Sequence, residues 1–394
     1  MKEIPLSAPN LNLNIIDNLK ECIESGWVST SGKFIAEFEE KVASYLKTGN
    51  AVACQSGTAG IHTALRILGV EPGDEVIVPT LTFIAAVNPV KYLGAEPVFM
   101  DCNDSLYMDT HKLRMFCEEE CILKDGVLTN LESGRKVKAI IVVHVFGNLC
   151  DMSEIMSIAG EYDLKVLEDA TEALGSYYKA GELKDKYAGT IGDIGVLSFN
   201  ANKIITTGGG GMILSNEEKY LDKARYLTTT AKDDSLYFIH DEVGYNYRML
   251  NIQAALGVSQ IDELEKFIDT KIKNYILYMD FLEGVAGLEV LPFMANTRAN
   301  HWFYSILIDN EFFMEEKHIP DARGHIMEAL IEEGIQTRPI WKLIHSQKPY
   351  LDNQSYEIKK APYYESHVLN VPCSTDLEPE DVELVSERII DIIR

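Results

Sequence analysis

Short apolar runs alternate with helix-like segments through the first half of the chain. Helical periodicity over Gly57–Leu68, Phe83–Tyr92 and Met152–Tyr162 separates several of these runs. Apolar runs of strand length, separated by helices, are typical of a mainly parallel sheet between two layers of helices. The pattern therefore predicts an α/β fold with right-handed βαβ crossovers. Its strands are predicted at Ala51–Gln55, Glu75–Pro79, Glu96–Asp101, Ile140–His144, Lys165–Glu168, Gly195–Phe199 and Gly211–Leu214.

This alternation changes at two places. Residues 104–138 have a weak apolar pattern and turn signals such as Asp125-Gly126, which indicate an insertion with a helix near Thr110–Glu119. From Asn251 to Leu282 apolar positions repeat at helical spacing, which predicts one long helix leading into a smaller α+β domain. We expect a large domain over residues 1–250 and a linking helix with a small domain over residues 251–394. The small domain is predicted to have strands at Trp302–Ile308 and Ile335–Thr337 and helices at Gly324–Glu333 and Pro379–Ile392.

Composition narrows the class of protein. The chain has 394 residues, 46% of them hydrophobic, and its formal net charge is −25. Such a charge repels polyanions, so nucleic acid and acidic membrane surfaces are not expected as partners, and an anionic substrate needs a local positive pocket. The seven cysteines form no CxxC pair, the nine histidines have no metal-ligand spacing, and no apolar run is long enough to span a membrane. We expect a cytoplasmic protein without a bound metal.

Candidate chemistry begins at Lys203. This lysine follows the strand that ends at Ser198-Phe199 and precedes the glycine run Gly208–Gly211. A lone lysine after a strand is usually a surface residue, and a glycine run alone usually serves a tight hairpin. A buried lysine, however, has a lowered pKa and becomes an amine nucleophile. Lys203 is therefore a candidate to join pyridoxal phosphate covalently.

Two other strand ends supply groups that suit the same cofactor. Asp169 follows a buried strand and is placed to keep a pyridine nitrogen protonated, although an aspartate there also caps helices. The small residues Ser56-Gly57-Thr58-Ala59 open a helix, where backbone N–H groups bind anions such as a phosphate, and Ser198 can add its hydroxyl. Phe83 ends the second strand segment and is placed either to stack on a flat cofactor or to pack in the core.

Taken together, these residues resemble one family over nearly the whole chain. The chain is similar to the fold-type I pyridoxal-phosphate enzymes of the DegT/DnrJ/EryC1/StrS group, the nucleotide-sugar aminotransferases. The landmarks are Gly26–Ser29, Ser56-Gly57-Thr58, Pro79–Phe83, His144–Gly147, Glu168-Asp169-Ala170, Ser198–Lys203, Thr207–Gly210, Gly244–Met249, Gly334-Ile335 and Arg338-Pro339.

The resemblance implies a role for each matching residue. Lys203 would hold the cofactor and move protons, Asp169 would pair with the pyridine nitrogen, and Phe83 would stack on the ring. The helix start at Gly57, Thr58 and Ala59, together with Ser198, would hold the phosphate. Asn246 would reach the phosphate of a partner subunit, so that the active unit would be a homodimer with shared active sites.

One position departs from the family pattern and bears on the substrate. The family commonly has Gln or His where this chain has Glu172, next to the cofactor's phenolic oxygen, and a carboxylate there must share a proton or meet a donor. The sub-group most similar to this chain serves legionaminic-acid and related diamino-sugar synthesis. The resemblance therefore implies glutamate as the amino donor and C4 of a nucleotide-linked 4-keto-6-deoxy-(N-acetylamino)hexose as the acceptor. Arg338 and Lys33 are the candidate cations for its diphosphate. The alternative for each is a surface charge, and for Lys33 a surface charge is the better explanation.

Three other functions fit the sequence less well. A sugar dehydratase of the same family lacks the lysine that is present here as Lys203. A non-catalytic regulatory homologue does not need the pair formed by Lys203 and Asp169. An enzyme similar to the cysteine desulfurases would need a reactive cysteine on a mobile loop, and none of the seven stands out.

Overall fold

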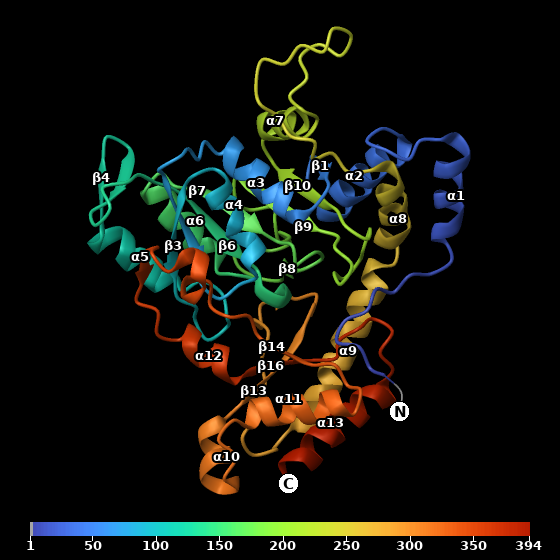
Figure 1. The fold of residues 1–394 in the computed structure, drawn as a ribbon, viewed down its shortest axis with the longest axis vertical. Coiled ribbons are helices and arrows are strands. Elements are labelled where there is room, and N and C mark those ends of the chain that lie inside the picture. Colours follow the sequence, from blue (N-terminus) through green and yellow to red (C-terminus); the bar gives the residue numbers. More distant parts are fainter. Residues whose placement is uncertain (1–2) are drawn as a thin grey trace.

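The computed structural model describes residues 3–394 and is built around an eight-stranded sheet with helices on both faces (Figure 1). The strand order is β1-β10-β9-β7-β6-β2-β3-β15, and the run from β9 to β15 is parallel throughout. The predicted α/β fold with a mainly parallel sheet is thus confirmed. In chain order the strands are β1 (Asn50–Cys54), β2 (Glu75–Pro79), β3 (Glu96–Met100), β6 (Val137–Val143), β7 (Lys165–Asp169), β9 (Ile194–Ser198), β10 (Gly211–Ser215) and β15 (Ser355–Tyr356).

Each strand of this sheet divides its side chains between two apolar cores. In β6, for example, Ile141 packs in one core and Ile140 in the other, because successive side chains point to opposite faces. One core lies under α3 (Gly57–Ile67), α4 (Asn88–Tyr92) and α7 (Glu218–Thr228). The other lies under α2 (Lys33–Leu46), α5 (Thr110–Glu119), α6 (Met152–Glu161) and α8 (Asn251–Ile261). Burial on both faces explains why the strands read as continuous apolar runs.

The strand at Gly211–Ser215 is antiparallel within the otherwise mainly parallel sheet. β10 is antiparallel to both of its neighbours, β9 and β1. It returns directly from β9 through residues 199–210, and so short a connection joins antiparallel strands. The glycine run therefore does serve a hairpin, and Lys203 lies in that hairpin's loop.

The C-terminal part is a smaller antiparallel sheet with helices beside it, seen below the large sheet in Figure 1. The single long helix expected from Asn251 to Leu282 is wrong, because the helix breaks at residues 262–263 into α8 and α9 (Leu264–Leu282). The strand expected at Ile335–Thr337 lies instead at β14 (Arg338–Pro339). The sheet order is β11-β13-β16-β14, with β11 (Leu288–Val290), β13 (Tyr304–Ile308) and β16 (Val368–Val371). Its helices are α10 (Asn310–Lys317), α11 (Ala322–Glu332), α12 (Ala361–His367) and α13 (Pro379–Ile393).

The remaining elements are short or peripheral. Within residues 104–138 the expected helix is present as α5, and a hairpin of β4 (Cys121–Lys124) and β5 (Val127–Asn130) follows it. The division into domains at residue 250 stays a prediction. In the described residues no helix is long and apolar enough to cross a membrane. Other elements are α1 (Ile15–Ser25), the pair β8 (Tyr177–Tyr178) and β12 (Thr297–Arg298), and 3-10 turns at Ile84–Ala86, Val145–Gly147, Ile344–Ser346 and Lys348–Tyr350.

Candidate active site

A cleft opens at the carboxyl ends of the central strands, between the large sheet and the C-terminal part. Its volume is about 350 Å³, within the usual range for a pocket that binds a small molecule. Asp169 is the last residue of β7 and Ser198 is the last residue of β9, so both reach this edge. The cleft is lined by Ser56, Gly57, Thr58, Ile61, Thr82, Phe83, Ala85, Ala86, Asp169, Thr171, Glu172, Ser198, Asn200, Asn202, Lys203, Gly209, Gly210, Trp302, Phe303 and Trp341.

Lys203 projects its amine into this cleft from the hairpin loop between β9 and β10. Its side chain is 12% exposed, and its Nζ lies 3.6 Å from Glu172 Oε1. The centre of the Trp302 indole is 3.8 Å from the same nitrogen. Burial lowers the pKa of Lys203, and the carboxylates of Glu172 and Asp169 oppose that shift. The result is an amine held in a nearly dry site and able to exist in its neutral, nucleophilic form.

The glycines that follow Lys203 bring the hairpin against helix α3. An added Cβ on Gly211 would meet the backbone of Ser56 at 2.6 Å. Gly210 has φ +136°, a conformation that side-chain-bearing residues rarely adopt. The glycine run thus serves close packing of main chain on main chain, which places Lys203 and the start of α3 around one cleft.

Asp169 and Glu168 are neighbours on β7, and they face opposite ways. Asp169 lines the cleft, where its Oδ1 accepts a hydrogen bond from the Thr171 N–H at 3.0 Å, and burial raises the pKa of its carboxyl. Glu168 points to the other face and accepts from Gly189, Ile191 and Gly192 N–H groups. Alternation along the strand therefore makes Asp169 the carboxylate available to a ligand.

Glu168 has a further partner in His144. The Cys150 N–H donates to His144 Nδ1 at 3.2 Å, so the ring proton sits on Nε2 and is donated to Glu168 Oε2 at 3.0 Å. All of these groups are buried, and Glu168 and its partners support β7 from behind the cleft.

Glu172 lies opposite Lys203 on the turn after β7. Its Oε2 accepts a hydrogen bond from the Phe146 N–H at 2.9 Å, and its side chain is 3% exposed. Burial raises the pKa of Glu172 to about 7, although Lys203 acts to lower it. At neutral pH this carboxyl is therefore poised between its protonated and ionised forms.

Helix α3 directs its N-terminus at the cleft. Ser56 caps the helix, its Oγ accepting from the Ala59 N–H at 3.1 Å. Gly57 lies close to Ser198, because an added Cβ would be 3.1 Å from the Ser198 Cβ and 2.9 Å from Thr171 Cγ2. Gly57, Thr58 and Ser198 line the cleft, whereas Ala59 lies behind them with its N–H engaged by Ser56. The first turn and Ser198 form a cradle suited to an anion.

Aromatic side chains form the walls of the cleft. Phe83 borders it and is 52% exposed. The rings of Trp302 and Phe303 are stacked with their centres 4.1 Å apart. The ring centres of Phe146 and Trp341 are 4.9 Å apart. The exposed face of Phe83 is available to a flat ligand.

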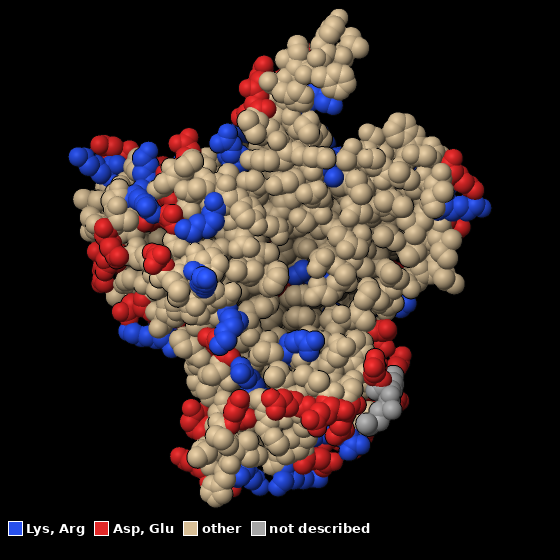
Figure 2. All heavy atoms as spheres, in the orientation of Figure 1, with Lys and Arg blue, Asp and Glu red and all other residues tan. Residues whose placement is uncertain are grey.

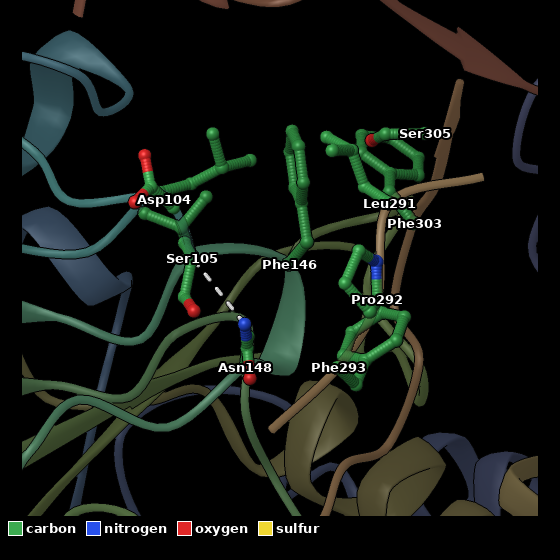
Figure 3. Close-up of a pocket in the computed structure, with 11 residues that line it drawn as sticks. Asp104, Ser105, Phe146, Asn148, Leu291, Pro292, Phe293, Phe303 and Ser305 are labelled. Carbon is green, nitrogen blue, oxygen red and sulfur yellow. Dashed lines mark hydrogen bonds between the residues drawn. The ribbon is translucent and has the colours of Figure 1, made fainter. Parts of the chain in front are cut away.

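A second, tighter pocket lies behind this aromatic wall (Figure 3). Figure 3 shows Phe146 standing between the Asp104–Ser105 segment and the Leu291–Phe293 segment, with Asn148 bonded to the Ser105 carbonyl at 3.2 Å. Phe146 has φ +56°, a strained value for a phenylalanine. Phe303 borders both pockets, so the wall separates them.

Three candidates lie away from the cleft. Asn246 lines a neighbouring hollow together with Arg248 and Gln253, beside the start of α3. Lys33 is exposed and forms an ion pair with Glu21, which agrees with its reading as a surface charge. Arg338 is exposed on β14, and its Nη1 donates to the Thr337 carbonyl.

Several residues of the site escaped the sequence analysis. Trp302 and Trp341 arrive from the C-terminal part, and Phe146 from the turn after β6. Only Phe146 carried a signal, since it lies within a recognised family landmark without an assigned role. The contact between Trp302 and Lys203 joins segments 99 positions apart, and no local pattern reports such a contact.

The groups around the cleft match the parts of pyridoxal phosphate. A buried amine suits its aldehyde, a buried carboxylate suits its pyridine nitrogen, a helix N-terminus with a hydroxyl suits its phosphate, and an exposed phenyl ring suits its flat face. The Gly57 backbone, where a Cβ would collide, leaves the cradle open. The fold and the site define a pyridoxal-phosphate enzyme of fold type I.

Comparison with known proteins identifies the family. The model of the DegT/DnrJ/EryC1/StrS aminotransferase family matches residues 9–390, and the chain belongs to that family. It is an aminotransferase, and its cofactor is pyridoxal phosphate. The chain is 34% identical to the GDP-perosamine synthase of Caulobacter vibrioides, covering 100% of this chain and 99% of the relative. It is 36% identical to the GDP-perosamine synthase of Escherichia coli O157:H7, covering 99% and 98%.

Solved structures share the fold. A DegT/DnrJ/EryC1/StrS aminotransferase from Brucella abortus superposes with a TM-score of 0.84 at 26% identity, covering 96% of this chain and 94% of that one. Helicobacter pylori PseC, an aminotransferase of pseudoaminic acid biosynthesis, superposes with a TM-score of 0.87 at 23% identity, covering 100% and 99%. The expected fold is therefore that of known aminotransferases.

Proposed function

We propose that this aminotransferase moves an amino group from glutamate to C4 of a nucleotide-linked 4-keto-6-deoxyhexose in the biosynthesis of a bacterial surface sugar. The observation that carries the proposal is the buried Lys203 amine, held 3.6 Å from Glu172 in a cleft that also contains Asp169. Relatives of the same length are named GDP-perosamine synthase, which supports a nucleotide-linked amino sugar as the product. The acetamido substituent and the legionaminic-acid sub-group remain predictions from the sequence.

Each residue of the cleft has a proposed task toward the cofactor. Lys203 would hold it covalently, Asp169 would keep its ring nitrogen protonated, and Phe83 would cover its face. When bound, pyridoxal phosphate supplies an electron sink for charge that develops on carbon. The phosphate would lie against Gly57, Thr58 and Ser198, and the Ala59 N–H would join them only by leaving Ser56. Asp169 and the helix start thus fix the orientation of the ring.

Proton transfer falls to Lys203. Burial lowers the pKa of its amine, so the neutral form is accessible and can accept a proton at Nζ. Glu172 Oε1 lies 3.6 Å away, at ion-pair distance, and its pKa is raised to about 7, so a small approach of the two side chains would let this carboxyl exchange that proton. Trp302 and Glu172 shield two sides of Nζ, and the Lys203 side chain is only 12% exposed, which limits loss of the proton to solvent.

The active unit is proposed to be a homodimer with shared sites. Asn246 does not line the cleft of its own chain and is therefore free to serve that of a second copy. Residues 232–243 form a loop that projects beyond α7 (Figure 1), and its Leu236, Tyr237, Phe238 and Val243 are each at least 69% exposed. A second copy of the chain would bury this apolar surface, with Asn246 at its base.

A diphosphate substrate requires positive charge that offsets the net charge of −25. Figure 2 shows basic side chains in and around the hollow at the centre of the displayed face, above a band of acidic side chains over the C-terminal helices. Arg338 does not line the cleft, but it comes three positions before Trp341, which does, and we propose it as the contributor from this chain for the part of the substrate that extends out of the cleft. Lys33 keeps its ion pair with Glu21 unless a ligand displaces it.

The test combines labelling with a substrate panel. Borohydride treatment of the holoenzyme should fix the cofactor on a peptide containing Lys203. With glutamate, the enzyme should aminate UDP-, GDP- or dTDP-linked 4-keto-6-deoxyhexoses, with or without an acetamido group, and mass spectrometry and NMR should place the new nitrogen at C4. A label on another lysine would refute the role of Lys203, and equal kcat/KM for free and nucleotide-linked keto sugars would refute the substrate class.

A further inference from the structure

Trp302 forms the side of the cleft nearest the Lys203 amine. The centre of its indole ring is 3.8 Å from Lys203 Nζ, and the tryptophan is 4% exposed. An ammonium over the face of an indole is attracted by the ring's negative quadrupole, and the attraction grows where water is excluded. Trp302 and Glu172 therefore hold the amine from two sides.

Every polar atom of Trp302 makes a hydrogen bond. Its indole N–H donates to the Asn202 carbonyl at 2.8 Å, beside Lys203 itself. Its backbone N–H is directed at the Phe146 carbonyl and at Asn300 Oδ1, and its carbonyl accepts from Lys271 Nζ and Cys373 Sγ. Turning the ring away from the amine would break the indole N–H bond to Asn202, and the backbone bonds hold in place the main chain from which the ring projects.

Asn300 ties Trp302 to the turn that carries Glu172. Its Nδ2 donates to the carbonyls of Glu172 and Leu174, each at 2.9 Å. His301, the residue between Asn300 and Trp302, has φ +52°, a strained conformation that the surrounding hydrogen bonds maintain. The two groups around the Lys203 amine are therefore positioned by one network.

We propose that Trp302 is a positioning residue for Lys203, whose indole face retains the free amine in the cleft whenever the amine is not joined to the cofactor. This inference rests on the proposed role of Lys203. A free lysine side chain has many rotamers, and holding it beside Glu172 keeps Nζ where it must receive and return protons. The competing explanation is that Trp302 only packs against Phe303 and Phe146.

The test weakens the quadrupole of the ring without changing its shape. The full-length chain is produced with tryptophan, with 5-fluorotryptophan or with tetrafluorotryptophan, and is then cleared of cofactor with hydroxylamine. The pKa of Lys203 is measured from the pH dependence of its acetylation, followed by mass spectrometry. The charged groups that face the Lys203 amine are Glu172 and Asp169. Both are the same in the chains made with tryptophan and with either fluorinated analogue. We expect the Lys203 pKa to fall stepwise, by about one unit at full fluorination.

Two variants provide matched controls. In Trp302→Phe the analogues enter only at Trp27 and Trp341, since the chain has three tryptophans, and the Lys203 pKa should not respond to fluorination. In Trp341→Phe the analogue remains at Trp302, and the stepwise fall should persist. A Lys203 pKa that does not change with fluorination in the wild-type chain would overturn the inference, even if Trp302→Phe does not fold.

The outcome separates this inference from the proposed function. Suppose that the pKa of Lys203 falls stepwise with fluorination but borohydride labels another lysine. That result would refute the proposed role of Lys203 in holding the cofactor, while the interaction between Trp302 and Lys203 would stand. An unchanged pKa with the label on Lys203 would refute only the positioning by Trp302.

Discussion

The backbone N–H of Phe146 donates a hydrogen bond to Glu172 Oε2 at 2.9 Å. Phe146 makes this contact from a left-handed backbone conformation, φ +56°, at the turn that follows β6. The strain turns one amide toward a buried carboxyl and leaves the other oxygen of that carboxyl toward Lys203. A strained turn at the end of β6 thus holds the Glu172 carboxyl and opposes the rise in its pKa that burial causes.

Glu172 should make stability depend on pH in a defined window. Its pKa is raised from 4.5 to about 7 by burial, so the folded chain keeps a proton that the unfolded chain has lost. The stability that comes from keeping Glu172 protonated in the folded chain is fully present below pH 4.5 and is lost as the pH rises through about 7. Glutamine does not titrate. Glu172→Gln should therefore gain stability relative to wild type as the pH rises between these values, as measured by urea unfolding of the cofactor-free chain.

The control for this prediction is Glu182→Gln, at an exposed position. Its free energy of unfolding should follow that of wild type at every pH. A difference between Glu172→Gln and wild type that does not change with pH would show that Glu172 titrates as an ordinary carboxyl.

Substitution of Asp169 should lower activity, whereas substitution of its neighbour Glu168 should lower stability. Asp169→Asn removes a buried charge from the cleft, and loss of one charge-assisted hydrogen bond is worth about 1.5–3 kcal/mol, so kcat should fall at least tenfold. Glu168→Gln instead places an NH₂ group among backbone N–H donors behind the strand and should lower the unfolding free energy by about 1–3 kcal/mol. Wild-type turnover in Asp169→Asn would reduce Asp169 to a structural residue.

A side chain at position 57 should weaken cofactor binding, because Gly57 lies in the cradle proposed for the phosphate. In Gly57→Ala the new methyl group would meet Thr171 and Ser198, which must move and open the cradle. The Kd for pyridoxal phosphate, measured by the change in absorbance, should rise at least tenfold. Gly160→Ala on α6 is the control, because nothing lies within 4 Å of its added Cβ. That variant should bind normally and gain up to about 1 kcal/mol of stability. Equal affinities in the two variants would contradict a phosphate site at the start of α3.

Mixed dimers should reveal a shared site. Lys203→Ala and Asn246→Ala chains, inactive or nearly so alone, should regain activity when they are unfolded and refolded together. About a quarter of wild-type activity is expected, because half of the dimers are mixed and each of those holds one intact site. Lys203→Ala mixed with Asp169→Ala should stay inactive, since both residues line the cleft of one chain. Recovery in neither mixture would indicate that each chain completes its own site.

The sequence alone determined the sheet and the residues that gather at its edge. Burial on both faces leaves a continuous apolar run, so the central strands could be recognised one segment at a time. Asp169, Ser198 and the start of α3 follow such strands, and the carboxyl ends of parallel strands meet at one edge. Their convergence on one cleft with Lys203 therefore follows from the order of strands along the chain.

The tertiary structure decided what lies across from these residues. Trp302 reaches Lys203 from the C-terminal part, β10 reverses direction, and Asn246 lines a hollow beside the cleft of its own chain. A hydrophobic pattern reports how one segment is buried and is silent on which distant segment covers it. The raised pKa of Glu172 depends on its distance from water and from Lys203, and only the packed chain sets those distances.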